Sequence, residues 1–198
     1  MSSQTSRVAQ YGVDKIFTDR WSPRAFTDEA IPDDVLLSLF EAARWAPSSY
    51  NSQPWRFIYA KRGTPDWNRF LSLLSARNQQ WARTASVLIV VVSAKEFTPP
   101  GATAPTESRS HAFDAGAAWA NLALQATIAG WHAHGIGGFD VERTRHELGI
   151  PPGYAINAVV AVGRRGDKSL IPETFHGAET PNGRRPVAEL AFSGRFPG

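Results

Sequence analysis

The chain has 198 residues, 42% of them hydrophobic and 11% aromatic, and this length predicts one domain with a substantial core. It contains no cysteine, which excludes disulfides, thiolate nucleophiles and cysteine-ligated zinc or iron–sulfur clusters. The net charge is +3, but no run of five to eight basic residues occurs, so composition does not favour a protein that binds nucleic acid.

Neither a secretory signal nor a membrane span is predicted. Residues 1–16 are polar and lack the apolar region of a signal peptide. The longest apolar run, residues 87–92, is far too short to cross a bilayer. We therefore expect a cytoplasmic protein with no membrane partner and no nucleic-acid partner.

Three elements are predicted in the first half of the chain: a helix over residues 33–45, a strand over 55–60 and a second helix over 66–74. Apolar residues recur at helical spacing on one face of the first helix, namely Val35, Leu36, Leu39, Phe40 and Ala43. Pro32 suits the start of that helix, where a missing N–H costs nothing, and Pro47 ends it.

Two continuous apolar runs, residues 86–93 and 156–163, predict strands that are buried on both faces. Such strands imply a sheet that is covered by helices on both sides, which is a three-layer arrangement. Between them, residues 98–110 are rich in proline, threonine and alanine and predict a mobile loop.

Residues 112–129 predict a long alanine-rich helix. One of its faces carries Phe113, Ala117, Ala120, Leu124 and Ile128. Its many alanines permit the close approach of another helix or of a second subunit. From about residue 167 the chain has little periodicity and predicts a C-terminal arm that needs another surface to lie on, within a single domain of residues 1–198.

Motifs of several other enzyme classes are absent from the sequence. There is no Gly-x-Ser-x-Gly elbow, and the glycine-rich residues 135–138 match neither the Walker nor the Rossmann pattern. His132 and His134 form a His-x-His pair, but no third ligand stands at a suitable spacing, so we expect no metal site.

Two polar stretches are candidates for chemistry. Arg20, Ser22 and Arg24 occupy alternate positions and would point to the same side of an extended segment. Such a set can bind a phosphate and a second electron-rich group, although ordinary surface arginines on a solvated segment would give the same pattern. The stretch of residues 42–55 concentrates five polar residues between two apolar elements, which is more than the capping of a turn requires.

Together these stretches resemble the nitroreductase family of flavin enzymes. The resemblance rests on Arg-x-Ser-x-Arg-x-Phe at residues 20–26 and on Ala-Arg-x-Ala-Pro-Ser-Ser-x-Asn-x-Gln-Pro-Trp at residues 43–55, in this order. Further matches are Asn78, the helix over residues 114–129, a loop over 130–140, the strand over 154–163 and Arg184-Arg185-Pro186. The resemblance covers nearly the whole chain, from about residue 14 to residue 196.

The resemblance implies an FMN-dependent homodimer. Its fold class would be α+β, a three-layer α-β-α nitroreductase-like fold with a mainly antiparallel central sheet flanked by helices. Arms would be exchanged between the subunits, and two FMN sites would lie at the dimer interface. The chemistry would take place on the flavin, so no protein residue is expected to be catalytic and none to bind a metal.

By the same resemblance, the cofactor-binding residues are Arg20, Trp21, Ser22, Arg24, Pro47, Ser48, Ser49, Asn51, Gln53, Asn78, Gly137, Gly138, Arg184 and Arg185. Arg20 and either Arg184 or Arg185 would hold the FMN phosphate, and Ser22 would bond the flavin or its ribityl chain. Arg24 would face the N1–O2 edge of the flavin, where a cation stabilises the charge that forms on reduction and raises the reduction potential.

Other members of this set would contact different parts of the flavin. Asn78 would bond the pyrimidine edge, and the backbone N–H groups of Gly137 and Gly138 would approach N5 because glycine has no Cβ. The residues of the second motif would come from the partner subunit, namely Pro47, Ser48, Ser49 and Asn51, with Gln53 less clearly assigned.

Two positions depart from the pattern of some family members. Gly137 stands where some members carry Glu, so the substrate cannot be inferred from side-chain contacts at that position. Asn182 stands where some members have Lys, which would weaken the grip on the phosphate unless Arg185 or Arg165 takes its place.

The implied function is an oxidoreductase that transfers hydride from NADH or NADPH to flavin N5 and passes electrons to a small-molecule acceptor such as a nitroaromatic or a quinone. A flavin-fragmenting or dehalogenating relative is an alternative, with residues 98–111 as its lid. A flavin-binding protein without turnover is a second alternative. The sequence does not decide between the two nicotinamides, and it does not say which aromatic residues line a substrate pocket.

Overall fold

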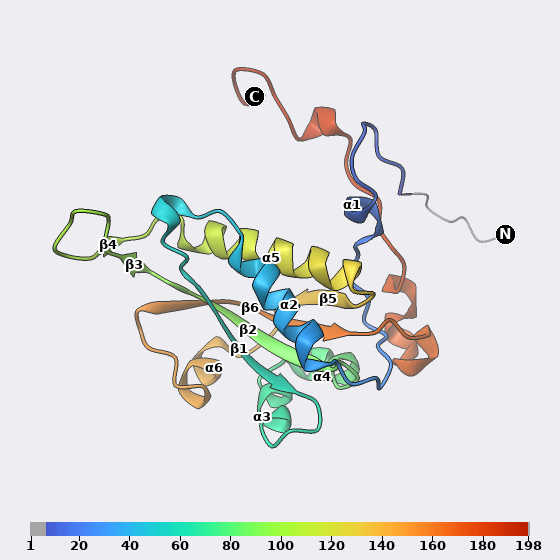
Figure 1. Cartoon of the computed structure of the whole chain (residues 1–198). Helices are drawn as coiled ribbons and strands as arrows, with labels where there is room; N and C mark the ends of the chain where they lie inside the picture. Colours follow the sequence, from blue (N-terminus) through green and yellow to red (C-terminus); the bar gives the residue numbers. More distant parts are fainter. Residues whose placement is uncertain (1–6, 198) are drawn as a thin grey trace.

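The computed structural model describes residues 7–197 and has three layers, a sheet with helices on both faces (Figure 1). The sheet is antiparallel throughout, with strand order β1-β2-β6-β5. These strands are β1 Trp55–Lys61, β2 Val87–Ala94, β6 Tyr154–Gly163 and β5 His132–Ile136. The expected three-layer α+β fold is confirmed.

The two apolar runs of the sequence form the central strands β2 and β6. Residues Val87 to Val92 are each at most 2% exposed, and Val159 to Val162 are equally buried. Val87 pairs with Val162, and the register shifts by one residue between Val91 and Val92. Each such side chain contributes roughly 1.5–3 kcal/mol by leaving water, so this pair of strands anchors the core.

Two helices cover one face of the sheet: α2, Asp33–Arg44, and α5, His111–Ile128. Leu36 and Leu39 of α2 pack with Leu122 of α5 and with the valines and isoleucines on that side of β2. The prediction for α2 differs by one residue, because Trp45 leaves the helical conformation and serves as the C-cap.

Three short helices cover the opposite face: α3 Trp67–Ser72, α4 Ala76–Ala82 and α6 Val141–Glu147. The helix predicted over residues 66–74 is shorter in the structure because its last residues turn toward another loop. The carbonyl of Leu73 accepts the N–H of Asp140 at 2.9 Å, and Leu74 forms a β-bridge with Phe139.

Two stretches expected to be loops contain strands. Glu96–Phe97 (β3) lies just before the region predicted as mobile and pairs with Thr106–Glu107 (β4) inside it, which forms a short hairpin. The first half of the loop expected over residues 130–140 is the edge strand β5, which lacks a continuous apolar run and buries Ala133 and Ile136.

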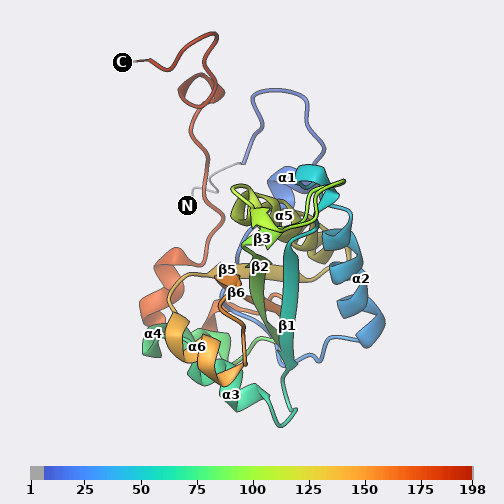
Figure 2. The same ribbon diagram turned by 90° about the vertical axis from the view of Figure 1, so that its left-hand side faces the viewer.

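The two ends of the chain leave the body on the same side (Figure 2). Near the N-terminal end lies the short helix α1, Ile16–Asp19. The C-terminal part of the chain contains 3-10 turns at Lys168–Leu170, Glu173–Ala178 and Val187–Glu189. Ile171 and Phe175 are buried in the core, whereas every residue from 182 to 197 is exposed. Within residues 7–197, no helix is long and apolar enough to cross a membrane.

Candidate functional site

The segment around Arg20 adopts the alternation that its sequence predicts. Trp21 and Pro23 are buried, whereas Arg20, Ser22 and Arg24 are half-buried. Arg20 donates a hydrogen bond from Nη1 to Ser22 Oγ at 3.2 Å. These residues line one cavity of about 610 Å³, which we call the arginine cavity and whose walls are Arg7, Arg20, Trp21, Ser22, Arg24, His134, Gly177, Ala178, Thr180, Asn182 and Arg184.

The arginine cavity is strongly cationic. Burial lowers the pKa of Arg20, and the positive charges of Arg7 and Arg184 lower it further. Burial likewise lowers the pKa of Arg7, with Arg184 adding to the effect and Asp19 opposing it. Guanidinium groups form charge-assisted, often bidentate hydrogen bonds with phosphate, so the cavity is suited to an anion of that kind.

Glu179 holds the Arg24 segment against the base of the C-terminal arm. Its carboxylate accepts the backbone N–H of Arg24 at 2.9 and 3.0 Å and that of Ala25 at 2.9 Å. The carboxylate therefore binds backbone groups of this segment, while the Arg24 guanidinium donates Nη1 to the carbonyl of Ala178 at 3.4 Å. No local pattern in the sequence points to Glu179, because its partners lie 154 and 155 residues away.

His134 enters the wall of the cavity from β5. Its Nδ1 lies 2.9 Å from the carbonyl oxygen of Pro23, which can only accept, so Nδ1 carries the proton. Burial lowers the pKa of His134 to about 4, and the charges of Arg24 and Arg20 act in the same direction. The imidazole is therefore neutral near pH 7. Across residues 7–197, no three histidine, aspartate or glutamate side chains gather as metal ligands.

Asn78 and Gly138 meet on the other side of Trp81. Asn78 donates Nδ2 to the carbonyl of Gly138 at 3.0 Å and accepts Trp81 Nε1 at Oδ1, at 3.2 Å. The Trp81 ring lies 4.7 Å from the His134 ring, and the Arg24 guanidinium lies 5.9 Å from its centre. Trp81 thus links Asn78 to the arginine cavity.

The two glycines expected near the flavin differ in their surroundings. A Cβ on Gly138 would lie 2.6 Å from Asn78 Nδ2, so any other residue there would have to displace the Asn78 amide. A Cβ on Gly137 would meet nothing within 4 Å. The protein itself therefore does not exclude a side chain at Gly137.

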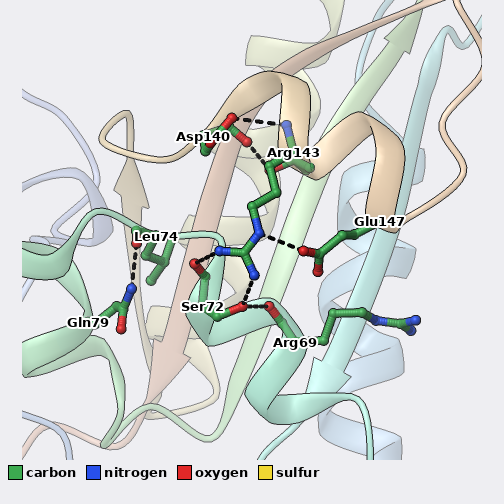
Figure 3. Close-up of polar contacts among 8 residues, drawn as sticks. Arg69, Ser72, Leu74, Gln79, Asp140, Arg143 and Glu147 are labelled. Carbon is green, nitrogen blue, oxygen red and sulfur yellow. Dashed lines mark hydrogen bonds and ion pairs between the residues drawn. The ribbon is translucent and has the colours of Figure 1, made fainter.

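A polar clasp fixes the loop that follows these glycines (Figure 3). Arg143 donates Nη1 to the Ser72 carbonyl at 3.0 Å, Nη2 to Ser72 Oγ at 2.8 Å and Nε to Glu147 at 2.5 Å. Asp140 caps α6 by accepting the N–H of Arg143 at 2.9 Å. The clasp joins α6 to the end of α3 and so holds in place the loop between Gly138 and α6.

The second motif lies near the N-terminal end of α5, at the opposite end of that helix from α1 (Figure 1). Ser49 donates its N–H to Asp114 Oδ2 at 3.1 Å, and Ser48 Oγ accepts the N–H of Gln53 at 3.1 Å. Tyr50, Asn51 and Gln53 have φ of 52°, 52° and 46°. Backbone in this left-handed region is strained for residues other than glycine and is concentrated at functional sites.

A second cavity, of about 470 Å³, lies between the Arg20 segment and the middle of α5. Its walls include Phe17, Arg20, Ser22, Trp119, Ala120, Ala123, Leu124 and Gly135. From Asp114 to Ala123 the helix axis rises about 14 Å. Within one chain the second motif therefore stands well away from the Arg20 segment.

The family model described as the nitroreductase family matches residues 17–164. The chain belongs to the nitroreductase family. The chain is also similar to a protein of Thermus thermophilus named NADH dehydrogenase, which is 31% identical over 171 residues, 73% of this chain and 82% of its own.

Other relatives of this nitroreductase-family chain are more similar in sequence. An uncharacterized 15.4 kDa protein of Mycolicibacterium smegmatis is 35% identical over 149 residues, 71% of this chain and 97% of its own. A solved structure described as an oxidoreductase containing FMN is 45% identical, with a TM-score of 0.93 and full coverage of both chains.

The structure brings together only part of the expected set of cofactor residues. Those that line the arginine cavity are Arg20, Trp21, Ser22, Arg24 and Arg184. Arg185 lines a neighbouring cavity of about 420 Å³. Those outside both cavities are Pro47, Ser48, Ser49, Asn51, Gln53, Asn78, Gly137 and Gly138.

Three titratable residues of the cavity region were not predicted as site residues: Arg7, His134 and Glu179. The first two line the cavity, and the third bonds its Arg24 segment. A period-two pattern identifies Arg20, Ser22 and Arg24 because they share one segment. The partners of Arg7, His134 and Glu179 in the site lie 13, 111 and 155 residues away, so the local period-two pattern does not include them.

Proposed function

We propose that this nitroreductase-family chain is the subunit of an FMN-dependent oxidoreductase that oxidises NADH or NADPH and reduces a nitroaromatic, quinone or similar small molecule. The observation that carries the proposal is the arginine cavity, in which the motif residues Arg20, Ser22 and Arg24 face Arg184 from the opposite end of the chain. The full-length likeness to an oxidoreductase containing FMN supports the choice of cofactor.

The residues present fit a flavin mononucleotide. The cavity volume of about 610 Å³ lies in the range of cofactor pockets. Burial and the neighbouring charges of Arg7 and Arg184 lower the pKa of Arg20, and a dianionic phosphate beside it would stabilise its charged form. The open space beside Gly137 would let a ring approach the backbone closely.

Bound FMN would supply the redox chemistry, accepting hydride from the nicotinamide and giving it up to the acceptor. Arg20 and Arg184 would hold the phosphate, and Ser22 would bond the flavin or its ribityl chain. Arg24 would stand at the ring edge where negative charge develops on reduction, and its guanidinium would stabilise that charge. Neutral His134 and Glu179 would keep the Arg24 segment in place through Pro23 and the backbone of Arg24.

A homodimer is part of the proposal because one chain leaves several surfaces uncovered. The apolar stripe of α5, by which we mean the predicted face with Phe113, Ala117, Ala120, Leu124 and Ile128, is turned away from the sheet at both ends, where Phe113 is 82% and Ile128 67% exposed. The exposed arm carries Leu190, Phe192 and Phe196. A second copy would cover these apolar groups and bring its strained second motif, residues 47–53, toward the first subunit's cavity.

The test begins with the purified protein and its flavin. We expect a yellow protein that releases FMN, and bleaching of the flavin by NADH or NADPH without oxygen. Reoxidation by an acceptor panel then identifies the second substrate. A colourless protein that takes up no added FMN would overturn the proposal, and a flavin that neither nicotinamide bleaches would indicate binding without turnover.

The variant Arg20→Ala tests whether Arg20 binds the FMN phosphate. Loss of a charged donor to the phosphate is expected to weaken FMN retention at least tenfold. The exposed Arg83, at the end of α4, offers the control Arg83→Ala, which should retain flavin like the wild type. Equal retention by Arg20→Ala and the wild type would contradict the role of Arg20 in phosphate binding.

A further inference from the structure

Arg7 reaches the arginine cavity from the segment that precedes α1. It donates Nη1 to the backbone carbonyl of Arg20 at 2.8 Å, and its side chain lines the cavity together with Arg20 and Arg184. A guanidinium carries five N–H donors, so one such bond does not saturate it. Arg7 is thus held beside the residue that the proposed function gives to the phosphate.

The charges around Arg7 favour an anion. Burial lowers the pKa of both Arg7 and Arg20, Arg184 lowers the pKa of Arg7 further, and Arg7 and Arg184 lower that of Arg20 further. Asp19 opposes the shift at Arg7, but Asp19 also pairs with Lys15. Like charges held in a half-buried cavity repel one another, and a phosphate monoester would relieve that repulsion.

The two ends of the chain hold each other at this point. Gln10 Oε1 accepts the backbone N–H of Val187 at 2.8 Å, and the segments around Arg7 and Arg184 line the same neighbouring cavity. This contact places Arg7 and Arg184 next to each other although they are 177 residues apart in the sequence. Both are therefore positioned by packing between the ends of the chain.

The other cations considered from the sequence occupy different places. The Arg165 guanidinium lies over the Trp21 ring, 5.2 Å from its centre, and is not part of the wall of the arginine cavity. Arg185 lines the neighbouring cavity. Asn182, which does line the arginine cavity, is uncharged.

We propose that Arg7 is a third phosphate-binding cation of the arginine cavity, acting with Arg20 and Arg184. The inference rests on the proposed function, and its ligand is a phosphate monoester. Two sources could supply that group: FMN, which carries a terminal phosphate that riboflavin lacks, and NADPH, which carries a phosphate that NADH lacks. We assign Arg7 to the phosphate of FMN, because Arg7 is bonded to Arg20 and shares a cavity with it.

The experiment compares flavins with and without the phosphate. Full-length protein is stripped of flavin and titrated with FMN or riboflavin, and the change in flavin fluorescence gives each affinity. For Arg7→Ala we expect FMN affinity to fall at least tenfold and riboflavin affinity to stay within twofold of wild type. Arg7→Lys, which keeps the charge, should recover part of the loss, and Arg83→Ala should behave like wild type.

Ionic strength provides a second readout of the same contact. Wild-type affinity for FMN should fall more steeply with salt than that of Arg7→Ala, because one charge pair fewer remains to be screened. Riboflavin affinity should respond little to salt in either protein. Equal salt slopes for FMN would contradict the proposal.

The remaining outcomes separate this proposal from the function on which it rests. Unchanged FMN affinity in Arg7→Ala, with normal binding by wild type, overturns the role of Arg7 alone. An equal loss of FMN and riboflavin assigns Arg7 a structural role only. If Arg7→Ala changes only the ratio of the KM values for NADPH and NADH, Arg7 binds the phosphate of NADPH and the assignment to FMN is wrong. Wild-type protein that binds neither flavin overturns both proposals.

Discussion

His134 stands in the wall of the arginine cavity with Nδ1 bonded to the Pro23 carbonyl and its ring against Trp81. Burial is the main cause of its lowered pKa. A neutral imidazole in this position holds the backbone between Ser22 and Arg24 without adding a further positive charge to the cavity. The sequence showed a His-x-His pair, but the contact that gives His134 this position spans 111 residues.

The lowered pKa of His134 predicts how stability depends on pH. The pKa is about 4 in the folded protein and near 6.5 when unfolded, so the unfolded chain takes up the proton first as pH falls. His134 therefore leaves the free energy of unfolding at its full value above pH 6.5 and lowers it as pH falls toward 4, by at most about 3–4 kcal/mol.

Urea unfolding at pH 7, 6 and 5 checks this expectation. His134→Gln keeps a donor for Pro23 but cannot titrate, so its stability should fall less between pH 7 and 5 than that of the wild type. The difference between the two proteins isolates His134 from other titrating groups. Parallel pH profiles for the two proteins would contradict the expectation.

Gly137 and Gly138 form a matched pair because one is enclosed by protein and the other is open. Gly138→Ala should displace the Asn78 amide and cost about 1–2 kcal/mol of unfolding free energy through the lost hydrogen bond and crowding. Gly137→Ala should leave the stability of flavin-free protein within about 0.5 kcal/mol of wild type.

If Gly137 faces the flavin ring, Gly137→Ala should impair flavin binding although it leaves the stability of the flavin-free protein unchanged. Gly137→Ala would then weaken FMN and riboflavin binding equally, because the added methyl group meets the ring and not the phosphate. Thermal unfolding of flavin-free protein and flavin titration measure the two effects separately. Unaltered flavin binding in Gly137→Ala would remove this residue from the proposed site.

At the scale of whole elements, α5 shows why periodicity alone could not assign its faces. Ala115, Ala118, Leu122 and Ala126 pack against the sheet, while the stripe with Phe113 and Ile128 is turned away from it. An alanine-rich helix is apolar nearly all round, so its sequence does not reveal which face meets the chain's own core. The predicted stripe therefore lies on the face that the proposed dimer would cover.

Phe113→Glu tests whether that face is covered by a second copy. In the isolated chain Phe113 is exposed, and a negative charge near the start of a helix is not destabilising. In a dimer interface the unpaired carboxylate would be buried at a high cost. We expect sedimentation equilibrium to show a weakened dimer and at least tenfold lower FMN retention.

Val141→Glu is the control, since Val141 is partly exposed on α6, on the opposite side of the sheet. It should leave the association state and the flavin content unchanged. A wild-type protein that sediments as a monomer would overturn the dimer directly. Equal association of Phe113→Glu and wild type would exclude the stripe from the interface.

For the whole molecule, the sequence predicted the central strands and the long helices because β2, β6, α2 and α5 carry strong apolar patterns. It did not predict β5, the β3–β4 hairpin, α4 or α6, which are short, polar or partly exposed. Such elements are stabilised by tertiary contacts, for instance the Arg143 clasp on α6, and not by their own periodicity.

The residues of the arginine cavity, like the elements of the fold, could be predicted from the sequence only in part. Arg20, Ser22 and Arg24 follow from one local pattern, whereas Arg7, Arg184 and Glu179 come together only when the ends of the chain fold back on the body. The role of residues 47–53 depends on a surface that one chain does not supply. A site shared by remote segments leaves little trace in any single stretch of sequence.

The bond between Gln10 and Val187 has a practical consequence for anyone who produces this protein. Trimming exposed tails is a common way to improve crystals, and residues 7–13 and 182–197 would be the first to be removed. Here such trimming would delete Arg7 and Arg184, which both line the arginine cavity. An affinity tag is therefore best made cleavable at either end, and flavin content should be measured before and after its removal.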